Sequence, residues 1–155
     1  MTHTARLAEL GLALPPVVPP LASYVPAVRT GDLVFTSGQL PLSGGELGGV
    51  GKVGAQVTPE RAKELARLCA LNALAAIDAL VGLDSVVRVV KVVGFVASTP
   101  DFTGQPAVVN GASELLGEVF GSEAGSAGSH ARSAVGVASL PLDAPVEVEL
   151  VVEVR

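Results

Sequence analysis

The stretch VVRVVKVVGFVA, residues 86–97, forms the most strongly β-favouring segment of the chain, and the fold depends on it. Valine and other β-branched or aromatic residues favour extended backbone. Side chains alternate between the two faces of a strand, so both faces here are apolar, with Arg88 on one and Lys91 on the other. A strand that is apolar on both faces requires cover on both. We therefore expect helices on one face and allow a neighbouring subunit on the other.

Two amphipathic segments are predicted to supply the helical layer. The first begins at Thr58, which can cap the helix, and is followed by Pro59 and Glu60, a proline and an acid suited to the first turn. It should extend to about Val81, with apolar residues recurring every three or four positions. The second spans about 105–120 and has the same periodicity.

The remaining β segments complete the architecture that the sequence predicts. Two short strands are expected near 24–28 and 33–37, and two more at 130–138 and 146–154. In the last of these, valine and leucine alternate with Glu147, Glu149 and Glu153. The predicted class is α+β, a mixed sheet of about six strands with two helices packed on one face.

The 155-residue length is typical of a single domain, and 49% hydrophobic residues is high for a monomer, which favours an oligomer. Residues 10–28 carry no charged side chain but hold five prolines, so they cannot form a membrane-spanning helix. We expect a short helix and a proline-rich arm over 1–21, and the folded domain over 22–155.

Cysteine, histidine and overall charge exclude several classes of function. A single cysteine, Cys69, lies in the apolar stripe of the first long helix, which predicts a reduced core thiol and a cytoplasmic protein. His3 and His130 lie far apart without a metal-binding motif, so neither a metal nor a cofactor is expected. The net charge of −5 argues against nucleic acid as a partner.

One arginine stands out in the segment HARSAVGVASLP, residues 130–141. Strand alternation places Arg132 on the same face as Ala134 and Gly136, beside very little side-chain volume. If the last two strands pair as a hairpin, Arg132 lies within one or two positions of Glu147 and Glu149. The arginine could then form a cross-strand ion pair or capture the carboxylate of a ligand. Sequence alone does not decide which of the two glutamates would face it.

Three motifs resemble the YjgF/RidA family, also labelled endoribonuclease L-PSP or chorismate-mutase-like. They are YxxxVRTGDLVFTSGQLP at 24–41, Asn110 in the second helix, and HARSAVGVASLPLDAPVEVE at 130–149, in one order across 22–154. The resemblance implies a chorismate-mutase-like (bacillus type) fold. It also implies a homotrimer around a central barrel, with three clefts between subunits.

The family's well-studied branch hydrolyses reactive enamine and imine acids, such as 2-aminoacrylate and 2-iminobutyrate, to 2-keto acids and ammonia. By resemblance, Arg132 holds the substrate carboxylate and Glu147 orients or activates water, as the two catalytic residues. The implied substrate-binding residues are Tyr24, Ser37, Gly38, Asn110 and Ala134. Ala134 and Gly136 replace the cysteine and the acidic residue common in that branch, so the cleft is expected to be wider.

Two other functions remain open. The protein could be a non-catalytic trimer that binds small carboxylate metabolites, or an endoribonuclease as the older family label says. Acidic charge and the lack of an expected histidine at the cleft argue against RNA cleavage. His130 would reopen that hypothesis if it faced Arg132.

Overall fold

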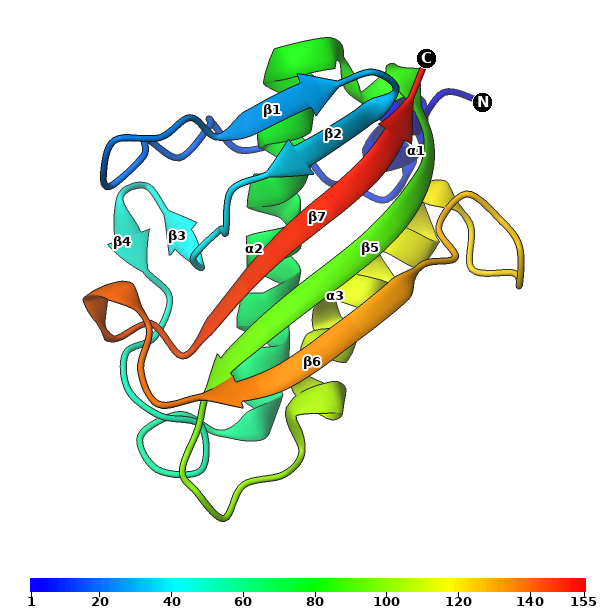
Figure 1. Ribbon diagram of the computed structural model, residues 1–155. Helices are drawn as coiled ribbons and strands as arrows, with labels where there is room; N and C mark the ends of the chain where they lie inside the picture. Colours follow the sequence, from blue (N-terminus) through cyan, green and yellow to red (C-terminus); the bar gives the residue numbers. More distant parts are fainter.

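A computed structural model describes all 155 residues and has two layers, a curved sheet and a pair of helices behind it (Figure 1). The sheet has the strand order β1-β2-β7-β5-β6. These strands are β1 (Ala27–Thr30), β2 (Leu33–Thr36), β7 (Val146–Val154), β5 (Val86–Ala97) and β6 (Ala131–Val137). The helices are α1 (His3–Glu9), α2 (Pro59–Val81) and α3 (Gln105–Phe120), and β3 (Leu42–Ser43) pairs with β4 (Glu46–Leu47) in a separate ribbon.

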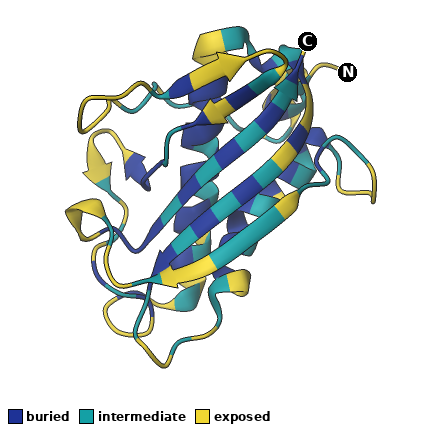
Figure 2. Cartoon of the chain, viewed as in Figure 1, coloured by how far each residue is buried: buried dark blue, intermediate teal, exposed yellow.

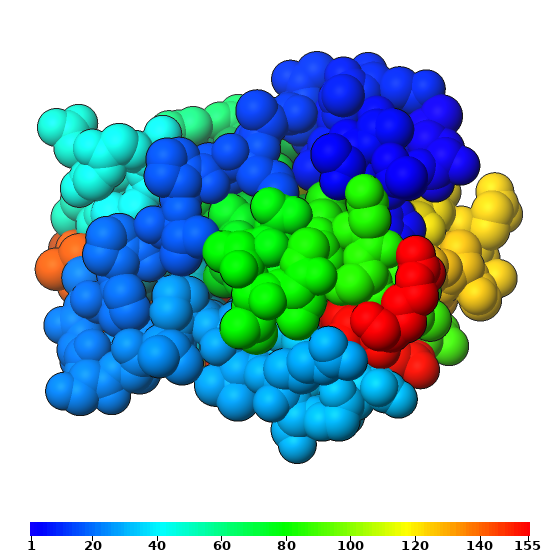
Figure 3. All heavy atoms as spheres, turned by 90° about the horizontal axis from the view of Figure 1, so that it is seen from above, coloured from blue at the N-terminus to red at the C-terminus, as the bar shows by residue number.

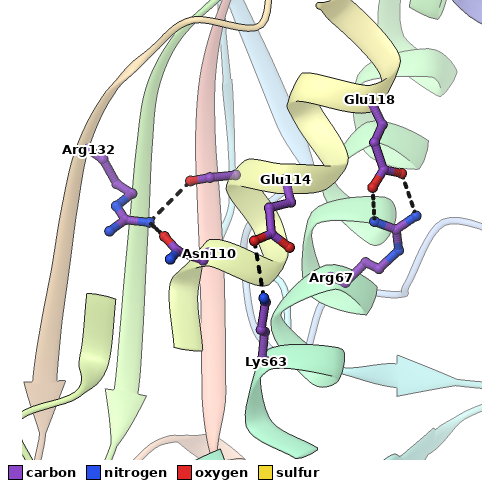
Figure 4. A network of polar contacts seen from close by, with 7 residues as sticks. Lys63, Arg67, Asn110, Glu114, Glu118 and Arg132 are labelled. Atoms are coloured by element: carbon purple, nitrogen blue, oxygen red, sulfur yellow. Dashed lines mark hydrogen bonds and ion pairs between the residues drawn. The ribbon is translucent and has the colours of Figure 1, made fainter. Parts of the chain in front are cut away.

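The two long helices form as their sequences predict. The Thr58 hydroxyl accepts a hydrogen bond from the backbone N–H of Arg61, and Pro59 occupies the first turn of α2. Between the helices, Arg67 donates two hydrogen bonds to Glu118, at 3.2 and 2.8 Å (Figure 4). The apolar sides of both helices are buried against the sheet, and Cys69 is buried among them.

Strand pairing differs from the predicted arrangement in two respects. The sheet has five strands rather than about six, and its first strand is β1 rather than a segment at 24–28. The expected hairpin between β6 and β7 is wrong, because β5 lies between them and pairs parallel with β6 and antiparallel with β7. The cause is α3, since a β5-α3-β6 crossover returns the chain parallel to β5.

The two faces of the sheet have different environments (Figure 2). On the helix face, Val146, Val148 and Leu150 of β7 are almost completely buried. On the opposite face, Phe35 and Val135 remain 45% and 44% exposed. We call this second surface the open face, because no element of the chain covers it (Figure 1).

The N-terminal segment packs on the end of the helical layer rather than on the open face. His3 donates from Nε2 to the carbonyl of Val86 at 2.9 Å, and Arg6 donates to the carbonyl of Glu118. Figure 3 shows the start of the chain, in dark blue, beside the yellow loop that follows α3. None of the helices combines the length and apolar character needed to cross a membrane.

Candidate functional site

Arg132 lies on β6 at the edge of the sheet and points toward α3. Its register partner is Val92 of β5, which in turn pairs with the buried Leu150 of β7, so all three belong to the helix face. The guanidinium Nη1 donates to Asn110 Oδ1 at 2.7 Å and to Ser113 Oγ at 3.3 Å (Figure 4). The structure therefore brings together Arg132 and Asn110, two residues that the family resemblance assigned to the site.

The rest of the Arg132 guanidinium has no partner within the chain. Only Nη1 makes hydrogen bonds, and no carboxylate lies within 4 Å of this side chain. The ion pair with Glu147 or Glu149 is therefore absent, and that hypothesis is wrong for the single chain. The Nε–Nη2 edge of a partly buried arginine is left free, and such an edge can grip a carboxylate with two parallel hydrogen bonds.

Small residues flank this arginine along β6, as the alternation predicted. Ala134 is the next residue on the helix face and lies opposite Gly94 of β5. Gly136 follows, and a side chain there would collide with the amide of Gln105. The space beside Gly136 is filled by Gln105, so the part of this site that remains without a partner is the free edge of the Arg132 guanidinium.

Two residues that the sequence analysis did not assign to the site complete its hydrogen bonding. Ser113 lies one helical turn after Asn110, a spacing that puts both on the same side of α3. The Ser113 hydroxyl is 2.9 Å from His130 Nε2, and His130 Nδ1 is 2.7 Å from the carbonyl oxygen of Gly128. The i, i+3 spacing from Asn110 was the available signal for Ser113. His130 is thus linked to Arg132 by hydrogen bonds through Ser113.

Glu147 belongs to a second group of residues, on the open face. Its carboxylate lies so close to Gly38 that any side chain at position 38 would collide with Oε1. Ser37 is adjacent, and its hydroxyl donates to the carbonyl of Val25. Tyr24 shares a shallow depression with Gly38, and its hydroxyl oxygen accepts a hydrogen bond from the Leu21 N–H at 3.1 Å. The structure therefore gathers four predicted residues here.

Burial perturbs the acid–base properties of this second group. It raises the pKa of Glu147 above its ordinary value, and the negative charge of Glu149 raises it further. Burial also raises the pKa of Glu149. Both glutamates point to the open face, but only Glu147 touches Gly38. A carboxyl group with a raised pKa is suited to accept and return a proton.

The Arg132 group and the Glu147 group do not meet within one chain. The first consists of Arg132, Asn110, Ser113 and His130, and the second of Glu147, Gly38, Ser37 and Tyr24. Glu147 pairs through Phe95 with Val135, three residues beyond Arg132 on β6. Two strand spacings and three residues separate the Cα atoms of Arg132 and Glu147 by roughly 14 Å, and the side chains leave opposite faces. A small molecule cannot contact both groups of the same chain.

The fold is α+β, a mixed sheet with two helices on one face, as in YjgF of E. coli. It carries an edge arginine with one free side and, on the opposite face, a half-buried carboxylate. The family model described as Endoribonuclease L-PSP matches residues 16–154. The chain therefore belongs to this family, the YjgF/RidA family.

Three relatives illustrate the range of similarity. Protein TCP17 of Trypanosoma cruzi is 46% identical, over 97% of this chain and 93% of its own length. The crystal structure of Atu1372 from Agrobacterium tumefaciens is 44% identical and has a TM-score of 0.87, covering 99% of this chain and 92% of that one. TdcF of E. coli, crystallised with bound serine, is 26% identical with a TM-score of 0.63, covering 92% and 94%.

Proposed function

We propose that this protein is a cytoplasmic enamine/imine deaminase that hydrolyses acids of the 2-aminoacrylate and 2-iminobutyrate type to 2-keto acids and ammonia. The observation that carries the proposal is the free Nε–Nη2 edge of Arg132 beside small residues. A carboxylate is the group that this edge binds best. Further support comes from TdcF, a family member crystallised with serine, which also carries a carboxylate next to a nitrogen-bearing carbon.

The proposed reaction requires positioning and proton transfer, with no metal or cofactor. Arg132 holds the carboxylate, and backbone groups of Ala134 orient the adjoining C=N bond. Glu147 accepts a proton from water as the water oxygen bonds to the imine carbon. Glu147 returns that proton to the nitrogen, which gives a neutral carbinolamine. Glu147 then carries the hydroxyl proton of the carbinolamine to the nitrogen, the C–N bond breaks as the C=O bond forms, and ammonia leaves. An enamine acid first takes a proton on its terminal carbon and loses one from nitrogen to become the imine. The raised pKa of Glu147 favours this exchange of protons.

The separation of the two groups supports a homotrimer with clefts between subunits. In each cleft, Arg132, Asn110 and Ala134 come from one chain, while Tyr24, Ser37, Gly38 and Glu147 come from its neighbour. The unpaired edge of β6 and the apolar open face are the surfaces that such an assembly would cover. The closed ring of three copies accounts for both surfaces at once.

The activity is tested by generating 2-iminobutyrate in situ with a threonine dehydratase and following its disappearance. We expect purified protein to accelerate hydrolysis in proportion to its concentration, and Arg132→Ala to remove the acceleration. If the wild-type protein has no effect at any concentration, the deaminase proposal is wrong for this substrate.

The shared cleft is tested by mixing two inactive variants, Arg132→Ala and Glu147→Gln, after subunit exchange. Random assembly gives both intact groups to about one cleft in four, so about a quarter of wild-type activity should return. Sedimentation should show a trimer for each variant and for the mixture. No recovery on mixing, or a stable wild-type monomer, would contradict the shared cleft.

An alternative is a trimer that binds small carboxylate metabolites without turning them over. It uses the same Arg132 edge, and calorimetric titration with serine and 2-ketobutyrate separates it from the deaminase. Binding that depends on Arg132, without imine hydrolysis, would favour this alternative.

RNA cleavage is the second alternative, favoured by the family's name and by the link between His130 and Arg132 through Ser113. Both His130 nitrogens are already hydrogen-bonded, which leaves neither free to move a proton of RNA. Purified wild-type protein and the Arg132→Ala variant should therefore show equal, background cleavage of RNA. Cleavage that is lost in the variant would favour the ribonuclease.

A further inference from the structure

We propose that Ser113 and His130 are positioning residues that fix the Arg132 guanidinium with its free edge turned toward the ligand. The inference rests on the proposed role of Arg132 in holding a carboxylate. Neither residue touches the substrate in this scheme. They act through a chain of hydrogen bonds that runs from the Gly128 carbonyl to Arg132 Nη1.

The direction of each hydrogen bond in this chain follows from the chemistry of its members. A carbonyl oxygen can only accept, so the contact with Gly128 places a hydrogen on His130 Nδ1. In the neutral ring, Nε2 then lacks a hydrogen and accepts one from the Ser113 hydroxyl. The Ser113 oxygen is left as an acceptor for Arg132 Nη1, so every donor in the chain has an acceptor.

Fixing one nitrogen fixes the whole guanidinium. Nη1 carries two hydrogens, and the structure directs one to Asn110 and the other to Ser113. Because the group is planar, two partners on Nη1 set both its plane and its rotation within that plane. Asn110 alone would leave the group free to swing about a single bond. Ser113 therefore decides where the Nε–Nη2 edge points.

The loop that follows α3 is built to hold the far end of the chain. A side chain at Gly128 would collide with the carbonyl groups of Gly121 and Leu116, so only glycine lets the loop close onto the helix end. The Ser126 hydroxyl donates to the Gly121 carbonyl at 2.8 Å and closes the same turn. The Gly128 carbonyl thus reaches His130 from a firmly packed position.

The tautomer of His130 is the first test, and it does not depend on activity. The chain has only two histidines, and His3 donates from Nε2 to the Val86 carbonyl, so it should be protonated on Nε2. Nitrogen NMR of 15N-histidine-labelled protein, at a pH where both rings are neutral, should show opposite tautomers, with His130 protonated on Nδ1. Two rings of the same Nε2–H form would overturn the proposal.

The second test asks whether Ser113 acts through Arg132. Ser113→Ala should raise KM about tenfold with a smaller change in kcat, and Ser113→Thr, which keeps the hydroxyl, should restore most of the loss. Ser129→Ala removes a nearby serine hydroxyl outside the chain of bonds and serves as the control. In an Arg132→Lys background, Ser113→Ala should have little further effect. If the Ser113→Ala and Arg132→Lys effects on KM multiplied fully in the double variant, the proposal would be overturned.

The two proposals fail in different ways. If the wild-type protein hydrolyses no imine, the deaminase proposal is wrong, while the His130 tautomer and the Arg132 Nε–H resonance still report on the positioning chain. We expect that resonance to be sharp in the wild type and in Ser113→Thr, and broadened in Ser113→Ala. If Ser113→Ala changed neither the activity nor the Arg132 resonance, the positioning role would be wrong, while the deaminase proposal would stand.

Discussion

The Arg132 group and the Glu147 group position opposite charges by opposite physical means. Arg132 is held by hydrogen bonds that it donates to side chains on α3, on the face of the sheet that the helices cover. Glu147 makes no hydrogen bond or ion pair through its side chain within the chain, and it lies against bare backbone at Gly38 on the open face. The guanidinium is oriented by hydrogen bonds, and the carboxylate is partly desolvated. Neither has an oppositely charged partner within its own chain.

The two groups suit different parts of the proposed reaction. A cation with one free edge can bind and orient a ligand, whereas a half-buried carboxyl group with a raised pKa can exchange protons. Because the two groups lie on opposite faces, a second copy of the chain is the simplest source of the missing half.

The largest effect is expected at the oriented cation. Arg132→Lys keeps the charge but loses the planar edge, so kcat/KM for the imine should fall about 100-fold or more. The melting temperature should change by no more than about 2 °C, because no ion pair is broken. Steady-state kinetics and calorimetry check both parts. A variant that fails to fold would show that Arg132 mainly serves stability.

The next largest effect is expected at the Glu147 carboxylate. Glu147→Gln should lower kcat about 100-fold with little change in KM, since it removes proton transfer and leaves carboxylate binding intact. Glu149→Gln is the matched control, two residues away on the same face, and should lower kcat only slightly. Equal losses in both variants would mean that the contact with Gly38 does not single out the functional glutamate.

Gly38 provides a smaller and more local change. The added methyl group of Gly38→Ala would collide with the Glu147 carboxylate and displace it, so kcat should fall about tenfold. Gly117→Ala is the control within α3, where the new methyl group meets only ordinary contacts and should stabilise the protein by about 0.5–1 kcal/mol. Unchanged kinetics in Gly38→Ala would show that the displaced carboxylate plays no part in turnover.

The smallest effect is on stability and depends on pH. The pKa of Glu147 is raised in the folded state, so its ionisation costs stability as pH rises from the ordinary carboxyl range through the raised value. Glu147→Gln should therefore raise the melting temperature by up to about 2 °C at pH 7 and have no effect below about pH 4.

Glu118 serves as a control, because its pKa is shifted in the opposite direction to that of Glu147. Its hydrogen bonds with Arg67 lower its pKa, so its ionised form adds stability that is lost as pH falls through the lowered value. Glu118→Gln should lower the melting temperature at pH 7 and converge with the wild type in strong acid. Thermal melts of the three proteins from pH 3 to 8 make the comparison. The same sign for both variants at pH 7 would contradict the assigned causes.

Local patterns in the sequence predicted much of the fold. The cap at Thr58 and the apolar periodicity located α2, and the valine-rich segments located β5 and β7. The motifs also identified the family correctly. These features depend on residues close together in the chain, where backbone preference and periodicity act directly.

The candidate site was predicted only in part, because its geometry depends on pairing between distant segments. The resemblance placed Arg132, Asn110, Glu147 and Gly38 in a cleft between subunits, with some residues from the adjacent chain. Within one chain the structure gathers them as two separate groups, Arg132 with Asn110 and Glu147 with Gly38. Ser113 carried no signal beyond its helical spacing from Asn110. A hydroxyl gains its role from the groups that tertiary packing brings to it.

Local sequence patterns set the two long helices, the valine-rich strands and the alternation that aligns Arg132 with Ala134 and Gly136. Composition set the high apolar content that favours an oligomer. Only the packing of the whole chain puts β5 between β6 and β7 and sends Arg132 and Glu147 to opposite faces. Alternation fixes which residues share a face within one strand. It does not fix which strands become neighbours, since that depends on the α3 crossover and the packing of the whole sheet.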